Sequence, residues 1–252
     1  MKNVRIILLC LLCLSFLFSC ADRSGREIIV ESSNSATSLK SKEERIAALN
    51  QSVFCISIFV KGKNFEKKVS VGTGFLVAGN LLATAFHVQT RAEELSRYFR
   101  TATYKIIAWK RLDAHQIIEF PIEMTFFNRE DDLAVYQFDT KTLRENAKTA
   151  SIKPLALAEN LPSISAEVVS IAYYGDYEFP FNSFGNVSMI DVNEDIISDI
   201  TLMSGNSGGP LCDLKTGEVL GVNVSVMSLG NDTVRFGFAK RATKLKALLQ
   251  KP

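Results

Sequence analysis

The sequence predicts an all-β protein built from two packed β-barrels. Short apolar runs rich in Gly and β-branched residues recur along the chain and are broken by turn residues, which is typical of strands. These runs fall into two groups on either side of a polar connector at residues 140–153. With 252 residues, 47% of them hydrophobic and 22% charged, the chain is long and apolar enough to bury a core.

The first twenty residues resemble an export signal. Lys2 and Arg5 precede an apolar run from Ile6 to Phe18, and the small residues at 19–21 follow it. The run is too short for a confident membrane-spanning helix. We therefore expect residues 1–20 to be a signal peptide and the protein to be exported.

The end of this signal offers two candidate cleavage sites. Residues 17–20, Leu-Phe-Ser-Cys, resemble a bacterial lipobox, in which Cys20 is lipidated and anchors the mature protein in a membrane, facing the periplasm or the cell surface. Cleavage after Ala21 would instead give simple secretion, and an uncleaved anchor is a third reading. Residues 21–41 are rich in Ser and predict a flexible tether, or an ordinary disordered N-terminus.

The folded domain is expected at residues 42–252. Residues 42–51 and 91–99 have helical patterns, and the Lys-, Ala- and Leu-rich tail at 240–251 predicts a terminal helix. The expected strands of the first group are 52–60, 68–77, 81–86, 104–109, 116–122 and 133–138, and those of the second are 167–173, 185–192, 196–202, 217–226 and 233–239. No sequence period points to a solenoid or a propeller.

Charge and cysteine usage exclude several classes of function. The formal net charge of +2 and the scattered Lys and Arg residues give no stripe for nucleic acid. Of five cysteines, only Cys55 and Cys212 lie beyond the leader. We expect both to be buried thiols, although export would also permit a disulfide between them. They are too few for a zinc site, and we expect neither metal nor cofactor.

The segment Gly205-Asn206-Ser207-Gly208-Gly209-Pro210 is the strongest candidate for chemistry. A serine hydroxyl is a poor nucleophile until a base takes its proton and the developing oxyanion is stabilised. Flanking glycines let the backbone turn tightly and direct N–H groups to one point. We expect Ser207 to be the nucleophile and the N–H groups of Gly205 and Ser207 to form the oxyanion hole. The alternative is an ordinary Gly-rich turn between strands.

The base should be a histidine, because imidazole titrates near neutral pH. The chain has two. His87 follows the apolar run at 81–86, so a buried strand would place it at a strand end. His115 lies between Ala114 and Gln116 in a polar turn and is expected to be an exposed loop residue.

The third group should be a carboxylate that fixes the histidine tautomer and stabilises the imidazolium. Asp132 opens the short apolar strand that begins at Leu133, and an acid at the mouth of a buried strand needs a partner. Asp131 is the neighbouring competitor, but successive residues of a strand point to opposite faces. We expect Asp131 to be a solvated turn residue.

These motifs together resemble the trypsin-like (chymotrypsin-fold) serine proteases. The order His, Asp, Ser is theirs, carried by Ala85-Phe86-His87, Asp132-Leu133-Ala134 and the Ser207 segment. Gly72-Thr73-Gly74-Phe75 and Gly221-Val222-Asn223 are similar to strands of the bacterial HtrA/Deg-like branch, here without a PDZ domain. The resemblance implies two six-stranded antiparallel barrels with the site between them, and a serine endopeptidase that cleaves protein or peptide substrates through an acyl-enzyme.

The same resemblance bounds specificity and activation. It places Thr201 at the floor of the specificity pocket, with Asn223 and Val224 beside it, so we expect small or medium apolar side chains rather than Lys, Arg or Glu at the cleaved position. Asn206 replaces the aspartate of members activated by a freed N-terminus, so activation of that kind is not expected. Two other functions stay open, a catalytically silent binding or sensor module and an esterase-type acyl hydrolase.

Overall fold

The computed structural model describes residues 41–250, with gaps at 64, 99–102, 145–151, 176 and 230–233. These residues belong to one compact unit, residues 40–252. The signal peptide, Cys20, both candidate cleavage sites and the tether lie outside the described residues. So does most of the expected connector at 140–153, apart from the short helix α3 (Lys141–Arg144) and the residues next to it.

Helix α1 (Lys42–Gln51) begins where the sequence predicts it. Ser41 accepts a hydrogen bond from the Glu44 N–H, and the Glu44 side chain accepts one from the Ser41 N–H, which makes a complete capping box. At its other end, α1 leads directly into the first strand. Arg45 donates through Nε to the Leu214 carbonyl at 2.9 Å, which ties the helix to the second group of strands.

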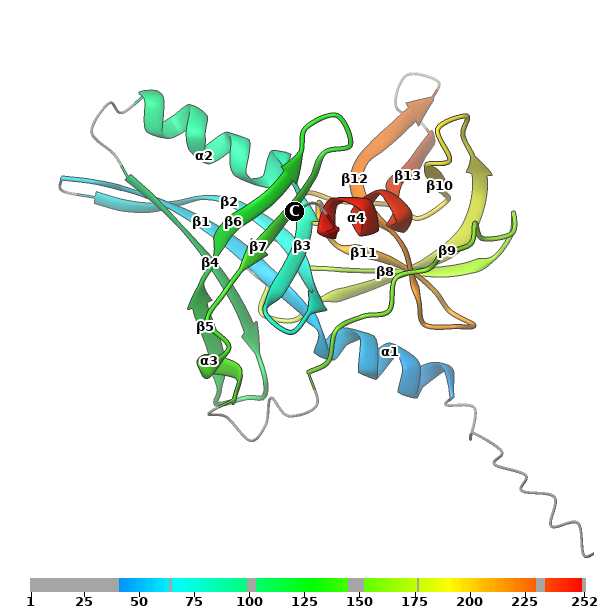
Figure 1. Cartoon of the computed structure of the whole chain (residues 1–252), viewed down its shortest axis with the longest axis horizontal. Helices are drawn as coiled ribbons and strands as arrows, with labels where there is room; N and C mark the ends of the chain where they lie inside the picture. The colour runs from blue at the N-terminus through cyan, green and yellow to red at the C-terminus, as the bar shows by residue number, and fades with distance from the viewer. Residues whose placement is uncertain are drawn as a thin grey trace, which may run out of the picture. The chain divides into compact units, whose positions relative to one another are not determined.

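The first group of strands forms one antiparallel sheet, called here the first sheet, in the order β5-β4-β1-β2-β3-β7-β6 (Figure 1). Its strands are β1 (Val53–Gly62), β2 (Phe65–Ala78), β3 (Leu81–Ala85), β4 (Thr103–Arg111), β5 (Ile117–Pro121), β6 (Glu123–Asn128) and β7 (Leu133–Gln137).

The expectation of a closed six-stranded barrel is wrong for this sheet, which has seven strands and stays open as a half-barrel. Its two edge strands, β5 and β6, are separated in sequence only by Ile122. The sheet must therefore curl strongly to bring its two edges together at this residue. The Ile122 N–H donates to the Ile106 carbonyl at 3.1 Å, while Pro121 at the end of β5 has no N–H to offer a further strand.

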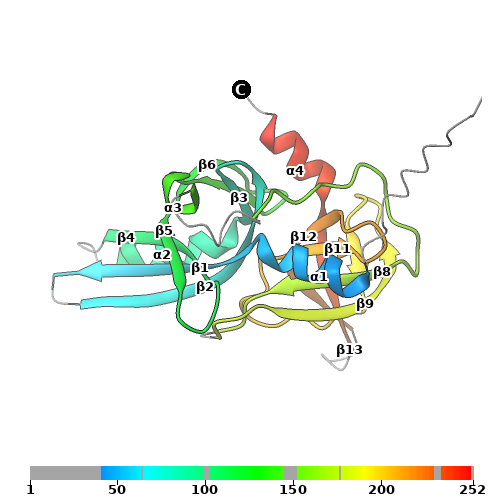
Figure 2. The same ribbon diagram turned by 90° about the horizontal axis from the view of Figure 1, so that it is seen from below.

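The second group forms the predicted six-stranded closed barrel, called here the second barrel, in the order β10-β13-β12-β11-β8-β9. Its strands are β8 (Glu167–Ala172), β9 (Phe181–Ile190), β10 (Ile196–Ser198), β11 (Pro210–Asp213), β12 (Val219–Leu229) and β13 (Val234–Arg241). Helix α4 (Ala242–Leu249) follows, as the tail composition predicts, and contacts both β12 and β6 (Figure 2).

Three local expectations need correction. Strands β6 and β11 carry no predicted run, because β6 is a half-exposed edge strand with interspersed polar residues and β11 has only four residues. Helix α2 (His87–Tyr98) begins earlier than the expected 91–99. His87 therefore opens a helix after a turn at Phe86, rather than ending a strand, and Thr90 Oγ1 donates to its carbonyl at 2.9 Å.

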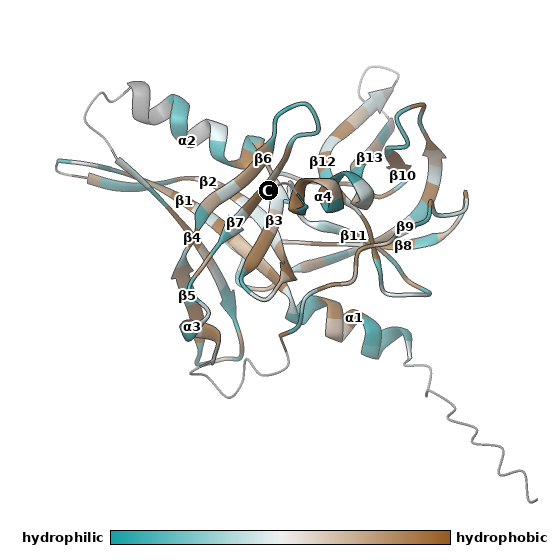
Figure 3. Cartoon of the chain, viewed as in Figure 1, coloured by the Kyte–Doolittle hydropathy of each residue, from teal (hydrophilic) through white to brown (hydrophobic). Residues whose placement is uncertain are grey.

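A shared apolar core joins the first sheet to the second barrel. Phe75, Ala83 and Leu133 of the first sheet belong to the same buried cluster as Ile171 and Val222 of the second barrel. Strands β3 and β7, which supply part of it, are hydrophobic along most of their length (Figure 3). Because interiors are close-packed, this core fixes how the two strand systems face each other.

The two cysteines of the described chain are both fully buried in that cluster, and no disulfide joins them. Cys55 lies in β1, and its sulfur is 3.9 Å from Ser57 Oγ. Burial raises the pKa of the Cys212 thiol, which keeps it protonated and unreactive. Both residues thus act as small apolar side chains of the core.

Candidate functional site

His87 and Asp132 are brought together at one end of the first sheet. His87 Nδ1 lies 2.6 Å from one carboxylate oxygen of Asp132, and the His87 N–H donates to the other oxygen at 2.8 Å. The carboxylate thus holds both the ring and the backbone of one residue. An acceptor at Nδ1 places the proton of a neutral imidazole there and leaves Nε2 as the free basic nitrogen.

The backbone around Asp132 is arranged for this contact. Asp132 has a φ of 53°, in the left-handed region that aspartate tolerates better than most residues. Its carbonyl accepts from the Phe86 N–H at 3.0 Å, which continues the β3–β7 pairing up to the histidine. Asp131 points elsewhere: its carboxylate accepts from Asn128 Nδ2 at 2.7 Å and lies 3.4 Å from Lys244 Nζ.

Ser207 lies in a tight loop, residues 203–209, called here the nucleophile loop. Three of its N–H groups donate within the loop or to β12. Asn206 donates to Met203 at 3.0 Å, Gly208 to Asn223 at 2.7 Å and Gly209 to Asn206 at 3.0 Å. Within the described part of the chain, the N–H groups of Gly205 and Ser207 donate to no protein atom. These are the two groups that the sequence predicts for an oxyanion hole.

The nucleophile loop belongs to the second barrel but packs tightly on the first sheet. A Cβ at Gly208 would lie 2.0 Å from Thr84 Oγ1, 2.2 Å from the Thr73 carbonyl oxygen and 2.8 Å from the Ala85 nitrogen. A Cβ at Gly72 would meet Val88 at 2.7 Å and the Ser207 carbonyl at 3.3 Å. Glycine at both places lets the loop reach the segment that carries His87.

Among the described residues, no hydrogen bond joins the Ser207 hydroxyl to His87. The contact across the site is made by backbone and by Thr73, whose N–H donates to the Ser207 carbonyl at 2.9 Å. Hydrogen bonds between a nucleophile and its base are often long without substrate and shorten in the substrate complex.

The candidate specificity residues occupy different environments. Thr201 is exposed on the segment that leads to the nucleophile loop. Asn223 is 1% exposed, and its Nδ2 donates to Ser170 Oγ at 2.9 Å, so its side chain supports the interior of the second barrel. Val224 forms a bulge in β12 and packs into the core of the first sheet. The backbone of Asn223 is what touches the nucleophile loop.

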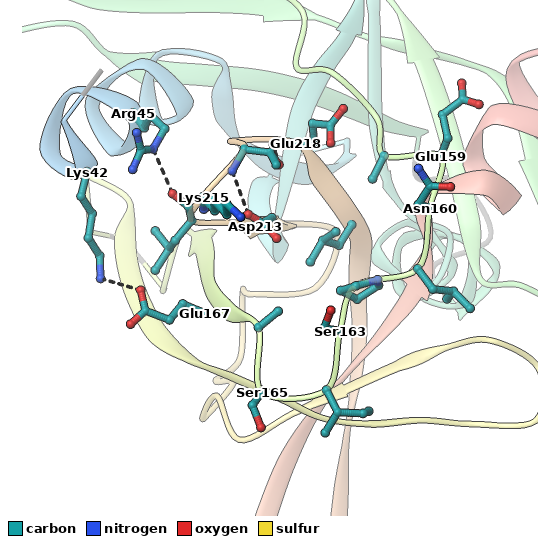
Figure 4. A pocket seen from close by; sticks show the side chains of 18 residues that line it. Lys42, Arg45, Glu159, Asn160, Ser163, Ser165, Glu167, Asp213, Lys215 and Glu218 are labelled. Atoms are coloured by element: carbon teal, nitrogen blue, oxygen red, sulfur yellow. Dashed lines mark hydrogen bonds and ion pairs between the residues drawn. The ribbon is translucent and has the colours of Figure 1, made fainter. Parts of the chain in front are cut away.

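Two cavities differ in whether they lie beside the candidate catalytic residues. A hollow of about 510 Å³ is lined by residues 68–71 of β2, Gly175, Ser204 and Gly205, so it opens beside the nucleophile loop. A larger one of about 830 Å³ lies between α1, residues 158–167 and the turn at 213–218 (Figure 4). It contains none of the three candidate catalytic residues, and Lys42 and Glu167 within it pair at 3.4 Å.

His115 is exposed in the turn between β4 and β5, as the sequence predicts, and its N–H donates to Asp113. In the described residues, no group of three or more His, Cys, Asp or Glu side chains is placed to hold a metal ion. The helices among them include none with the length and apolar character that crossing a bilayer requires.

The protein-family model of the trypsin-like peptidase domain matches residues 72–222, more than half of the chain. The chain belongs to this family. It is 25% identical, over 206 residues, to a probable periplasmic serine endoprotease, DegP-like, of Rickettsia prowazekii (strain Madrid E). That match covers 73% of this chain and 34% of the relative, so the chain spans about one third of the relative's length.

A solved structure, that of the serine endoprotease from Yersinia pestis, superposes with a TM-score of 0.60. It covers 84% of this chain and 66% of that chain at 17% sequence identity, a likeness that concerns the fold. The similarity to the HtrA/Deg-like branch expected from the motifs is confirmed by these matches.

One residue at the site has no predicted role. Thr73 is fully buried between Gly72 and Gly74 and makes hydrogen bonds to both Gly205 and Ser207. The sequence shows it only as the middle of a Gly-Thr-Gly segment, which resembles the HtrA/Deg-like strand but gives no reason to connect it with a loop more than 130 residues away.

Proposed function

We propose that this trypsin-like protein is an exported serine endopeptidase that uses Ser207 as nucleophile, His87 as base and Asp132 as the group that orients the base. The observation that carries the proposal is the Asp132 carboxylate, whose two oxygens take the Nδ1 and the backbone N–H of His87. That arrangement sets one tautomer and leaves Nε2 available to receive a proton. Within the described residues, the N–H groups of Gly205 and Ser207 donate to no protein atom, which supports the second requirement of acyl transfer, a site for the oxyanion.

The reaction follows from these positions. Ser207 Oγ forms a bond to the carbonyl carbon of the scissile peptide while His87 Nε2 takes the hydroxyl proton. The negative charge that develops on the carbonyl oxygen is stabilised by the N–H groups of Gly205 and Ser207. The C–N bond then breaks, and His87 returns the proton to the leaving amine. Water releases the acid from the acyl-enzyme by the same steps.

Polypeptides are the proposed substrates. The hollow of about 510 Å³ beside Gly205 is lined in part by residues 68–71 of β2, so an extended chain bound there would lie next to a strand. Thr201, at the family's pocket-floor position, offers no charge to a basic side chain, so we propose small or medium apolar residues at the cleaved position. The buried side chains of Asn223 and Val224 would act there only through the backbone of β12.

Export is part of the proposal. The relative from Rickettsia is described as probably periplasmic, and the first twenty residues of this chain have the pattern of a signal peptide. We propose that Cys20 is lipidated and anchors the enzyme to a membrane facing the periplasm or the cell surface. A mass measurement of the mature N-terminus tests this, since cleavage after Ala21 would give an unmodified N-terminus instead.

The decisive test compares the full-length protein with its Ser207→Ala variant. Both are incubated with unfolded casein, the fragments are identified by mass spectrometry, and both are treated with a fluorophosphonate that labels activated serines. We expect cleavage and labelling of the parent alone. Labelling without casein cleavage would point to a selective protease or to another acyl substrate. If neither protein cleaves nor is labelled, the catalytic assignment is wrong and a binding module replaces it.

A further inference from the structure

Thr73 connects the first sheet to the nucleophile loop through its backbone N–H and its hydroxyl. Its N–H donates to the Ser207 carbonyl at 2.9 Å, and its hydroxyl donates to the Gly205 carbonyl at 2.8 Å. Its own carbonyl accepts from Thr84 Oγ1 at 2.7 Å. The residue is 0% exposed, so these bonds do not compete with water.

The direction of the Thr73 hydroxyl is fixed by a fourth contact. The Tyr173 N–H donates to Thr73 Oγ1 at 2.8 Å, which occupies a lone pair of the hydroxyl. A hydroxyl has one proton, and that proton is therefore directed to the Gly205 carbonyl. The result is a chain of two hydrogen bonds, from Tyr173 of the second barrel through Thr73 of the first sheet to the nucleophile loop.

Gly205 is where such a restraint has the largest effect. Its φ is +100°, and glycine alone would leave the two peptide planes around it free to turn. A peptide unit is planar, so fixing the Gly205 carbonyl fixes the plane of the Gly205–Asn206 bond. Fixing the Ser207 carbonyl does the same on the far side of the loop. The Ser207 N–H lies between these two anchors, and the Gly205 N–H belongs to the peptide unit just before the first anchor. Within the described residues, neither N–H donates to a protein atom.

We propose that Thr73 is a positioning residue that keeps the N–H groups of Gly205 and Ser207 directed at the oxyanion site. This inference rests on the proposed acyl-transfer function. It gives Thr73, which is not part of the triad, the role of holding the oxyanion hole in place. Thr73 touches no substrate in this arrangement and acts only through the two carbonyls that it holds. An oxyanion hole stabilises the transition state more than the bound substrate, so its support affects the chemical step.

The test uses two variants of Thr73 and one control. Thr73→Val keeps the shape and the backbone N–H but removes the hydroxyl, whereas Thr73→Ser keeps the hydroxyl and removes a methyl group. Ser57→Ala is the matched control, because Ser57 is 1% exposed in the adjacent strand β1 and its hydroxyl accepts from Trp109 Nε1 at 2.9 Å, away from the loop. All three are compared with the parent in the full-length protein.

For Thr73→Val we expect the rate of fluorophosphonate labelling and kcat on a peptide substrate to fall about 10- to 100-fold, below the 10²–10³-fold typical of losing an oxyanion donor outright. KM should stay within about twofold of the parent value, since ground-state binding is unchanged. Thr73→Ser should restore most of the rate, and Ser57→Ala should retain it. Equal losses in Thr73→Val and Ser57→Ala, or no rescue by serine, would show that a buried hydroxyl matters only for packing.

Hydrogen exchange gives a readout that does not depend on turnover. In Thr73→Val, peptides covering residues 203–209 should exchange faster than in the parent, whereas Ser57→Ala should leave them unchanged. If the parent proves inert but the loop still loosens in Thr73→Val, the proposed function fails and the positioning role of Thr73 stands. Unchanged exchange together with unchanged labelling would overturn the role of Thr73.

Discussion

The first sheet and the second barrel contribute to the site in different ways. The base follows β3 and its orienting acid precedes β7, two strands that pair as neighbours. The Asp132 carboxylate contacts the His87 ring nitrogen Nδ1 at 2.6 Å and accepts from the His87 backbone N–H at 2.8 Å. Within the described residues, the nucleophile loop of the second barrel has turn bonds of its own and two hydrogen bonds to Asn223 of β12. Its remaining anchors, at Gly205 and Ser207, come from Thr73 of the first sheet.

This difference shows that the base–acid pair is assembled by local strand pairing, whereas the nucleophile loop depends on docking between two separately built strand systems. The shared core at Phe75, Leu133 and Val222 sets that docking. Damage to the base–acid pair should therefore change the chemistry without loosening the fold, and damage at the contact between the two strand systems should affect both.

Asp132→Asn should cause the largest loss of activity with little change in stability. The amide of the variant would offer one acceptor oxygen where two N–H groups of His87 now donate, so its NH₂ group would face either the ring or the backbone. We expect kcat to fall by about 10⁴-fold, the size of this effect in a well-characterised triad enzyme. Steady-state kinetics and a urea melt measure the two quantities, and Asp131→Asn is the control, expected to stay near the parent in kcat.

Gly208→Ala should damage both activity and stability, because it acts at the contact. The added Cβ would meet Thr84 and Thr73 at 2.0 and 2.2 Å and sits at a φ of +85°. Overpacking and the left-handed backbone together cost about 2–5 kcal/mol. Gly217→Ala is the matched control, since its φ is +77° but its nearest neighbour, Arg45, is 3.9 Å away. Urea unfolding should show about 1 kcal/mol for that variant; similar losses in both would mean the close fit is unimportant.

Lys110 tests the stability of the first sheet at its junction with α1. Its ammonium donates to the carbonyls of Asn50 and Val53 at 2.6 and 3.3 Å, and burial lowers its pKa to about 8. The unfolded chain keeps this proton up to about pH 10.5, so between these values unfolding takes up a proton and stability rises with pH.

Relative to Lys110→Met, the parent should gain up to about 3 kcal/mol in free energy of unfolding between about pH 8 and 10.5. Urea unfolding curves of both proteins, recorded at several pH values in this range, measure the difference. The contributions of ionisable groups that the two proteins share cancel. If the difference in free energy of unfolding between the two proteins stays constant with pH, the lowered pKa of Lys110 is contradicted. Since the Lys110 ammonium contacts the end of α1 and the start of β1 and not the triad, the fluorophosphonate labelling rate at pH 7 should be the same in the folded variant.

Much of the architecture follows from local pattern. Apolar runs of five to ten residues mark most strands, and the Ser41–Glu44 capping box marks the start of α1. Strand β6 escapes prediction because an edge strand with half-exposed side chains has no continuous apolar run. The open seven-stranded form of the first sheet escapes it as well, since closure depends on how far the sheet curls at Ile122 and not on the composition of any strand.

By itself, the sequence determined an all-β chain in two groups of strands and the residue types of the candidate site, because strand periodicity and Gly-flanked serine chemistry are local properties. Only the tertiary structure decided that Phe86 and His87 would lie against Asp132, that Asn223 would face inward to Ser170, and that Thr73 would hold Gly205. These contacts join residues 45 to 132 positions apart. The first two depend on strand pairing between segments distant in sequence, and the contact of Thr73 with Gly205 depends on how a shared apolar core docks two strand systems. No local pattern encodes either.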